Sequence, residues 1–375
     1  MPEPRTTVLH ERHAQLGAAF TDFGGWLMPV RYGSDLAEHR RVRETAGLFD
    51  ISHMAEFWVT GDDAADLLDY ALAGAMSPMP VGKAKYALLL AEDGGIIDDL
   101  IVYRTAQDAF LVVANAGNHD PVAVELEHRR AAWADAHGGG PHLEDVSEQY
   151  ALLAVQGPLS REILEATAGV MISGTPLATL AYYAWTEGTF AGASLFVART
   201  GYTGEDGFEL LIPTAAAGEL WDALLAAGIP LGLVPAGLAA RDTLRLEAGM
   251  PLYGHELTRD TRPAQAGLAR AVAVDKADFV GKAALAATDL STAPVLVGLA
   301  SDGKRAGRAG YAVFDGDERV GEVTSGALSP TLGHPIAMAL VLPAAAAPGT
   351  ELTIDVRGAR IPATVTTLPF YRRKK

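Results

Sequence analysis

The stretch KYALLLAEDGGIIDDLIVYR, residues 85–104, predicts a β-hairpin. Two apolar runs flank Asp93, Gly94 and Gly95, and we expect these three residues to supply the positive φ angles that a tight turn needs. This hairpin is the starting point for predicting the fold class, because it places two strands of one sheet side by side without a helix between them.

Two adjacent aspartates interrupt the second strand of this hairpin. Because successive side chains of a strand point to opposite faces, Asp98 shares one face with Leu100, and Asp99 shares the other face with Tyr103. A carboxylate that faces a core without a partner costs several kcal/mol, so we expect it to be paired, hydrogen-bonded or placed at a polar cavity. The alternative is an aspartate near the turn that accepts hydrogen bonds from backbone N–H groups, and the pattern alone does not decide between them.

Helices and strands are mixed on both sides of the hairpin. A helix at 34–47 is expected to have Ser34 as its N-cap and Gly47 at its end. Further helices are predicted at 61–74, 121–136, 159–169, 215–228 and 237–249, and further strands at 56–60, 109–115, 150–157, 194–200 and 207–213. Hairpins and helices without a regular strand–helix alternation indicate an α+β fold and not a doubly wound parallel sheet.

The last part of the chain has a different pattern. Six short strands with Gly and Pro turns are predicted at 295–300, 310–315, 318–326, 336–342, 351–356 and 362–367, which indicates a small, barrel-like all-β domain. A length of 375 residues suggests two or three domains. We predict a discontinuous α+β domain of 1–50 plus 145–290, an inserted α+β domain at 51–144 and the all-β domain at 291–375.

Composition narrows the function classes. The chain has 30 Lys and Arg against 46 Asp and Glu, a net charge of −16, so binding to the phosphates of nucleic acid is disfavoured. It has no cysteine, which excludes disulfides, thiolate nucleophiles, iron–sulfur ligation and Cys-based zinc sites. No apolar signal core and no stretch of about 18 uncharged apolar residues is present, so we expect a cytoplasmic protein that does not bind a membrane.

Two common kinds of catalytic site also lack support. The run HERH at 10–13 does not have the spacing of the helical zinc motif and the other histidines are scattered, so we expect no metal. The Gly-x-Ser-x-Gly elbow of the α/β hydrolases is absent.

The stretch RTGYTGEDGFEL at 199–210 resembles neither a dinucleotide fingerprint nor a P-loop. It predicts a tight loop that leads into a strand, on which Glu209 faces away from Phe208 and Leu210. A planar carboxylate in that position can accept two adjacent N–H groups of a heterocycle. The alternative is an ordinary surface glutamate.

The stretch GLAARDTLRLEAGM at 237–250 places Arg241 and Arg245 one helical turn apart on one face. An arginine there can clamp a carboxylate or stack on an aromatic ring. The alternative is a salt bridge within the helix, and both remain open at this point.

Taken together, these motifs resemble the T-protein family of the glycine cleavage system, the folate-dependent aminomethyltransferases. The resemblance runs from about residue 7 to 372 in family order. It rests on the segments DFGGWLMPVRYGS, VRETAGLFDISHM, GKAKYALLLAEDGGIIDDLIVYR, AVQGP, RTGYTGEDGFEL, GLAARDTLRLEAGMPLYGHEL, DFVGK and TSGALSPTLG. Their co-occurrence is far more specific than any single motif.

The resemblance implies three domains in a cloverleaf around a central cavity that holds tetrahydrofolate. It also implies a reaction in which the aminomethyl group on the dihydrolipoyl arm of the H protein releases ammonia and yields 5,10-methylenetetrahydrofolate. By motif position, Asp99 is expected beside the reacting folate nitrogens. The residues expected to line the folate pocket are Tyr86, Asn115, Tyr183, Tyr202, Glu209 and Arg241, with Glu209 at the amino-pyrimidine edge of the pterin.

Some positions depart from the family pattern. Gln265 and Arg270 replace a more usual acid and Trp, and Ala239 replaces a common Gly. These replacements bear on the details of folate packing and of access to the cavity. Two rival functions are a folate-dependent demethylase of the same superfamily and a non-catalytic folate-binding assembly protein. The hallmark of the second is a cysteine-bearing motif, which this chain lacks.

Overall fold

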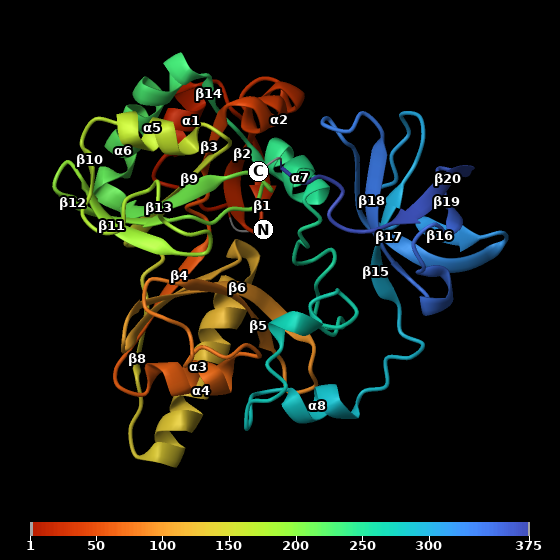
Figure 1. Cartoon of the computed structure of the whole chain (residues 1–375), viewed down its shortest axis with the longest axis horizontal. Coiled ribbons are helices and arrows are strands. Elements are labelled where there is room, and N and C mark those ends of the chain that lie inside the picture. The colour runs from red at the N-terminus through yellow and green to blue at the C-terminus, as the bar shows by residue number, and fades with distance from the viewer. Residues whose placement is uncertain (1–2, 374–375) are drawn as a thin grey trace. The chain divides into compact units, whose positions relative to one another are not determined.

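The computed structural model describes residues 3–373 (Figure 1). The chain forms two compact units, the first from Met1–Ala71, Ala75–Ala87 and Leu100–Arg241 and the second from Leu72–Gly74, Leu88–Asp99 and Asp242–Lys375. The predicted α+β class and the all-β C-terminal barrel are confirmed. The division into domains at 1–50 plus 145–290, 51–144 and 291–375 stays a prediction.

A seven-stranded sheet and its helices form the core of the first unit. The strand order is β10-β11-β12-β13-β9-β3-β14, antiparallel except for the parallel pair β14 and β3. The strands are β3 (Ala46–Asp50), β9 (Tyr150–Gln156), β10 (Val170–Ile172), β11 (Trp185–Phe190), β12 (Ala193–Ala198), β13 (Gly207–Pro213) and β14 (Leu233–Pro235). Helices α5 (Ser160–Ala166) and α6 (Thr214–Gly228) pack against each other and against β13.

The burial pattern of β13 follows from its alternating sequence. Phe208 and Leu210 are fully buried and belong to the same apolar cluster as Trp221 of α6. Glu209 therefore points away from that core, as predicted. The N-terminal part of this unit adds α1 (His10–Gln15), β1 (Ala19–Phe23), β2 (Trp26–Arg31) and α2 (Asp35–Glu44). Elsewhere in the unit, short 3₁₀ turns lie at Ala116–Asn118 and Ile229–Leu231.

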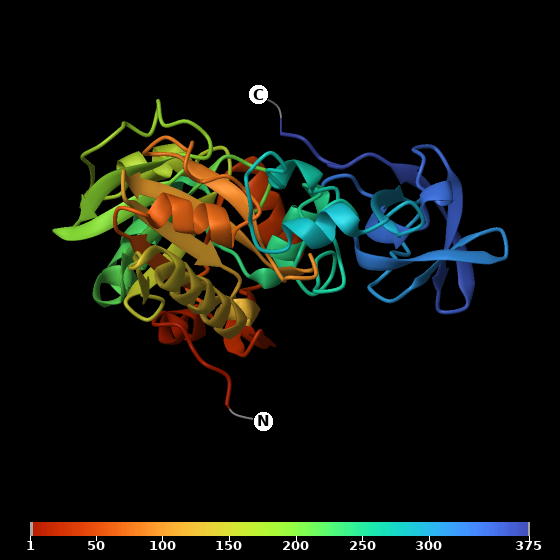
Figure 2. The same cartoon turned by 90° about the horizontal axis from the view of Figure 1, so that it is seen from below.

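A second sheet has the strand order β5-β6-β7-β4-β8. Its strands are β4 (Ala55–Thr60), β5 (Ala84–Leu90), β6 (Ile96–Ala106), β7 (Ala109–Ala114) and β8 (His142–Asp145). Helices α3 (Ala64–Ala71) and α4 (His119–His137) pack against each other, α3 also against β7 and α4 against β8 (Figures 1 and 2). The predicted hairpin at 85–104 is therefore present as β5 and β6.

The second unit contains a closed barrel with the strand order β15-β18-β17-β16-β19-β20, coloured blue in Figure 1. The strands are β15 (Val295–Ala300), β16 (Ala312–Asp315), β17 (Glu318–Leu328), β18 (Pro335–Val341), β19 (Glu351–Val356) and β20 (Ala359–Thr366), so all six predicted strands are found. Most of helix α7 (Leu238–Glu247) and all of α8 (Lys282–Ala287) belong to this unit, with 3₁₀ turns at Ala269–Ala271 and Pro343–Ala345.

One prediction about the helix at 34–47 was wrong. Ser34 does cap α2, with Oγ 3.4 Å from the Ala37 nitrogen, but the helix ends at Glu44. Gly47 lies in β3, where an added Cβ would overlap the side chain of Val42, so the glycine serves close packing and not helix termination.

The turn of the β5–β6 hairpin was also predicted incompletely. Of Asp93, Gly94 and Gly95, only Gly94 has a positive φ, at 84°. The Asp93 side chain instead accepts a hydrogen bond from the Gly95 nitrogen at 2.9 Å. A Cβ at Gly95 would overlap the carbonyl oxygen of Arg259, so this second glycine is required by a close backbone approach.

Candidate functional site

Glu209 is held by two hydroxyl groups on one of its carboxylate oxygens. Oε2 accepts hydrogen bonds from Thr200 Oγ1 at 2.5 Å and from the Tyr103 hydroxyl at 3.4 Å. In the part of the chain that the structure describes, no group donates a hydrogen bond to Oε1. The protein thus orients the carboxylate and leaves one oxygen as an acceptor for another molecule.

Tyr103 is a candidate residue that motif matching missed. Its side chain is buried, and its hydroxyl lies 3.0 Å from Thr200 Oγ1. Burial, followed by the negative charge of Glu209, raises the pKa of the Tyr103 phenol well above its ordinary value, so it stays protonated and can donate. The signal was present in the alternation of β6, which places Tyr103 on the strand face of Asp99.

Arg241 lies in the first turn of α7 and stacks on an aromatic ring. Its guanidinium carbon is 4.9 Å from the ring centre of Tyr202. Burial lowers the pKa of Arg241, while the charge of Glu209 and the Tyr202 phenol raise it. The structure contains no ion pair between Arg241 and Glu209, and none of the described residues accepts a hydrogen bond from the guanidinium. Its donors are therefore not used by the described part of the chain.

The loop that carries Tyr202 is rigidly held by Gln156 at the end of β9. The Gln156 amide donates to the Thr200 carbonyl at 3.0 Å and accepts from Thr203 Oγ1 at 2.9 Å. A Cβ on Gly201 or Gly207 would overlap that amide. Gly201 and Gly207 are therefore packing requirements of the loop and Gly204 has a positive φ of 78°, which explains the glycines of RTGYTGEDG without a phosphate ligand.

The remaining predicted pocket residues of the first unit are Tyr183, Tyr86 and Asn115. Tyr183 has an unusual left-handed backbone, with φ at 57°, and its nitrogen donates to the Arg199 carbonyl at 3.0 Å. It also lies near enough to Tyr103 to raise the pKa of that phenol. Tyr86 lies on β5, and Asn115 directly follows β7. The structure brings Tyr103, Tyr183 and Glu209 together, with Arg241 and Tyr202 beside Glu209.

His53 completes the electrostatic surroundings of Arg241. It lies in the turn between β3 and β4 and is 3% exposed. Burial and then the positive charge of Arg241 lower the pKa of His53 to about 4, against the opposing effect of Asp50. Asp50 accepts hydrogen bonds from Thr7 at 2.6 Å and contacts His13 Nε2 at 2.8 Å. His53 is thus a neutral imidazole at neutral pH.

Asp98 and Asp99 belong to the second unit. Asp98 is fully buried and Asp99 is half-buried, as expected for side chains on opposite faces of β6. Burial, then the charge of Asp98 and more weakly that of Asp99, raise the pKa of the Tyr253 phenol, against the opposing effect of Arg259. Its hydroxyl donates to the Ile96 carbonyl at 3.2 Å. Tyr253 is a further polar group near the aspartate pair that sequence reasoning did not single out.

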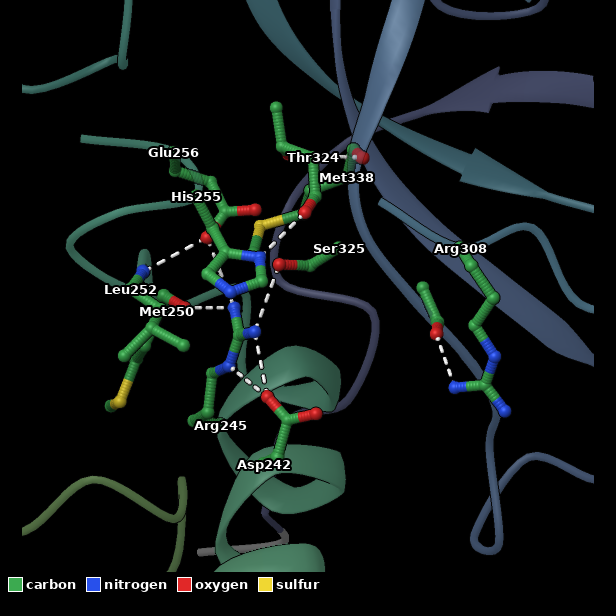
Figure 3. Close-up of polar contacts among 11 residues, drawn as sticks. Asp242, Arg245, Met250, Leu252, His255, Glu256, Arg308, Thr324, Ser325 and Met338 are labelled. Atoms are coloured by element: carbon green, nitrogen blue, oxygen red, sulfur yellow. Dashed lines mark hydrogen bonds and ion pairs between the residues drawn. The ribbon is translucent and has the colours of Figure 1, made fainter. Parts of the chain in front are cut away.

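Arg245 has a structural environment, shown in Figure 3. Its guanidinium pairs with Asp242 at 2.7 Å and with the buried Glu256 at 3.1 Å, and it donates to Ser325 Oγ at 2.8 Å and to the Met250 carbonyl at 3.3 Å. These contacts join α7, the following loop and strand β17 of the barrel. The alternative of a structural salt bridge thus holds for Arg245.

Three residues, Gln265, Arg270 and Ala239, depart from the family pattern. Gln265 accepts from the Arg262 nitrogen at 2.9 Å and donates to the Pro294 carbonyl at 3.0 Å, so it ties together two loop segments. Arg270 lies in a 3₁₀ turn and Ala239 in α7.

Among residues 3–373, no three His, Asp or Glu side chains gather in a way that could hold a metal ion. Within the same range, no helix has the length and apolar character needed to span a membrane.

Comparisons with known proteins place this chain in a family. Residues 9–276 match the family model of the GCVT N-terminal domain, and residues 295–372 match that of the glycine cleavage T-protein C-terminal barrel domain. The chain therefore has both domains of a glycine cleavage T-type protein, the N-terminal domain and the C-terminal barrel.

Full-length relatives and a solved structure agree. Aminomethyltransferases from Saccharopolyspora erythraea and Streptomyces avermitilis are 52% and 53% identical, over 100% and 99% of both chains respectively. The crystal structure of glycine cleavage system aminomethyltransferase T from Bartonella henselae is 38% identical, covers 99% of each chain and has a TM-score of 0.88. The chain therefore belongs to the glycine cleavage T-protein family, and the predicted enzymatic activity, that of an aminomethyltransferase, is confirmed.

Proposed function

We propose that this enzyme takes the aminomethyl group from the dihydrolipoyl arm of a lipoylated H protein and uses tetrahydrofolate as its co-substrate, giving 5,10-methylenetetrahydrofolate and ammonia. Family membership supports the reaction. The observation that carries the folate assignment is that Arg241, which has unused donors and stacks on the Tyr202 ring, lies within electrostatic reach of Glu209, which has an unused acceptor oxygen.

These residues fit the chemistry of a pterin. A carboxylate acceptor matches the adjacent N–H groups of an amino-pyrimidine edge, and an aromatic ring backed by a guanidinium offers a surface for stacking. Tyr86, Asn115 and Tyr183 are proposed to complete the binding surface. The bound co-substrate supplies a nucleophilic amine nitrogen that accepts the one-carbon unit.

Asp99 is the proposed catalytic residue. The transferred carbon lies between nitrogen and sulfur, so loss of either leaving group builds positive charge on it. A fixed carboxylate stabilises that charge and can hold or move a proton at its own oxygen. Removing one such preorganised group typically costs about 10²- to 10³-fold in rate.

The test is ammonia release from glycine-loaded, lipoylated H protein in the presence of tetrahydrofolate. Asp99→Asn should keep folate affinity and lose about 10²- to 10³-fold in single-turnover rate. Asp108→Asn, at an exposed position in the turn after the same strand, is the matched control and should behave as wild type. Undiminished turnover by Asp99→Asn would refute the catalytic role.

A second variant tests the binding role of Glu209. Because its carboxylate is proposed to accept N–H groups of the ligand, Glu209→Gln should raise the dissociation constant of tetrahydrofolate with a smaller effect on the rate of the bound complex. Unchanged folate affinity in that variant would count against the assignment. The rival demethylase and assembly-protein functions are not favoured by the matches to aminomethyltransferases.

A further inference from the structure

His53 is the buried polar group beside Arg241 that the proposed function leaves without a role. Its side chain is almost completely removed from solvent, and its ring packs edge-on against Phe23 at 5.6 Å between centroids. Nδ1 is fully buried and has no hydrogen-bond partner among residues 3–373. Native proteins rarely leave a buried polar atom unpaired without a reason, so this side chain calls for an explanation.

The two ring nitrogens of His53 have different access. Neither forms a hydrogen bond with a described residue, yet only Nδ1 is completely buried, so Nε2 retains the access to the surroundings. Burying an unpaired lone pair costs less than burying an unpaired N–H group. The favoured neutral form therefore carries its lone pair on Nδ1 and its proton on Nε2, the nitrogen that another molecule can reach.

The charge of the surroundings keeps this ring neutral. Arg241 is a cation within electrostatic reach of His53, and a second positive charge there is opposed both by burial and by that cation. A neutral imidazole can present a single N–H donor without repelling Arg241. Arg241 lies within electrostatic reach of both His53 and Glu209, and the guanidinium donors, Oε1 of Glu209 and the Nε2–H of His53 each have no hydrogen-bond partner among the described residues.

We propose that His53 is a further ligand-binding residue, which donates a hydrogen bond from Nε2–H to an acceptor atom of the bound folate co-substrate. This inference rests on the proposed function and deepens it. The ligand must combine N–H donors for Glu209 with lone-pair acceptors for His53 and Arg241, which is the donor and acceptor pattern of a heterocyclic amide.

Three substitutions separate the two nitrogens. A Gln amide reaches about as far as Nε2, an Asn amide only as far as Nδ1, and Leu carries no polar atom. With 5-methyltetrahydrofolate as the calorimetric probe, His53→Gln should bind within about threefold of wild type, since it replaces the donor. His53→Asn and His53→Leu should each weaken binding about tenfold, because the ligand acceptor is left unpaired.

A measurement on the wild-type chain guards against misfolded variants. With ¹⁵N-labelled histidine, one resonance pair, identified by its loss in His53→Asn, should show the Nε2–H form and shift when the probe is added. A shift confined to other histidines, or equal affinities of the Gln and Asn variants, overturns the inference. If wild type does not bind the probe at all, or Glu209→Gln binds it unchanged, the proposed function itself fails, which is a distinct result.

Discussion

Arg241 and Arg245 stand one turn apart on α7, and their guanidinium groups have opposite surroundings. Arg245 is almost completely buried and is satisfied by Asp242, Glu256, a serine and a backbone carbonyl (Figure 3). Arg241 stacks on Tyr202 and donates no hydrogen bond to a described residue. The same residue type on one helix thus serves the fold in one case and remains available to a ligand in the other.

Structural and functional charges in this enzyme differ in whether the protein itself supplies their partners. A buried charge must be paired, or it destabilises the fold by several kcal/mol. An arginine whose donors are all used by the protein cannot donate to a substrate, whereas one with unused donors can bind a ligand. The following predictions test whether this criterion holds for this enzyme.

The largest effect is expected for Arg245→Met. Removing this cation leaves the carboxylate of Glu256, which is fully buried, without its partner, so the free energy of unfolding should fall by about 3–5 kcal/mol. Urea unfolding measures the loss. Folate affinity per folded molecule should stay unchanged, and a loss of stability below about 1 kcal/mol would contradict a structural role for Arg245.

Arg241→Gln should give the converse result. Loss of a charged donor set weakens tetrahydrofolate binding about 10- to 100-fold, the usual value of hydrogen bonds to a charged group. The free energy of unfolding should change by less than about 1 kcal/mol, because no protein acceptor loses its donor. Calorimetry and urea unfolding of the same preparation check both halves, and a large loss of stability with normal affinity would contradict the assignment.

Glu56 sharpens the criterion, because it is a buried polar group outside the ligand set. It lies on β4, both carboxylate oxygens lack partners within residues 3–373, and burial, then Asp145, raises its pKa well above the ordinary value. The unfolded chain ionises this group at lower pH than the folded chain does, so stability is lost as the pH rises from the ordinary pKa toward the folded one.

Glu56→Gln removes that ionisation. The variant should be more stable than wild type at pH 7 by about 1 kcal/mol, and the gain should vanish below the ordinary carboxyl pKa. Thermal unfolding between pH 4 and pH 8 measures it. A gain that does not depend on pH would show that the carboxyl group does not titrate as described.

A similarly small effect is expected for Tyr103→Phe. The change removes the hydroxyl that contacts Thr200 and Glu209 and keeps the buried ring, so stability should fall by about 0.5–1.5 kcal/mol. Thr200 still holds Glu209, and folate affinity should fall only a few-fold. A loss as large as that of Arg241→Gln would mean that Tyr103 itself binds the ligand.

Local sequence patterns predicted the parts of the site that depend on them. The period of two along β13 predicted the direction of Glu209, and the same period placed Tyr103 on the face of Asp99. The six barrel strands were visible because each is a short apolar run between turn residues. Residues 185–190, by contrast, contain two threonines, a glutamate and a glycine, and the pattern did not mark them as strand β11.

Long-range partners were beyond the reach of these patterns. A helical period places Arg241 and Arg245 on one face and gives them equal weight. Only the fold shows that Glu256 and Ser325, 11 and 80 residues further along, use up the donors of Arg245. The role of Gly47 was missed for the same reason, since its contact with Val42 is a matter of packing and not of helix ends.

The left-handed backbone at Tyr183 has an evolutionary consequence. Any residue with a side chain pays roughly 1–2 kcal/mol for that conformation, and glycine does not. A laboratory selection for heat resistance alone would therefore favour glycine in place of Tyr183. A selection for growth on glycine would retain the ring, because it is proposed to form part of the folate-binding surface. Selection for heat resistance and selection for activity would therefore favour different residues at this position.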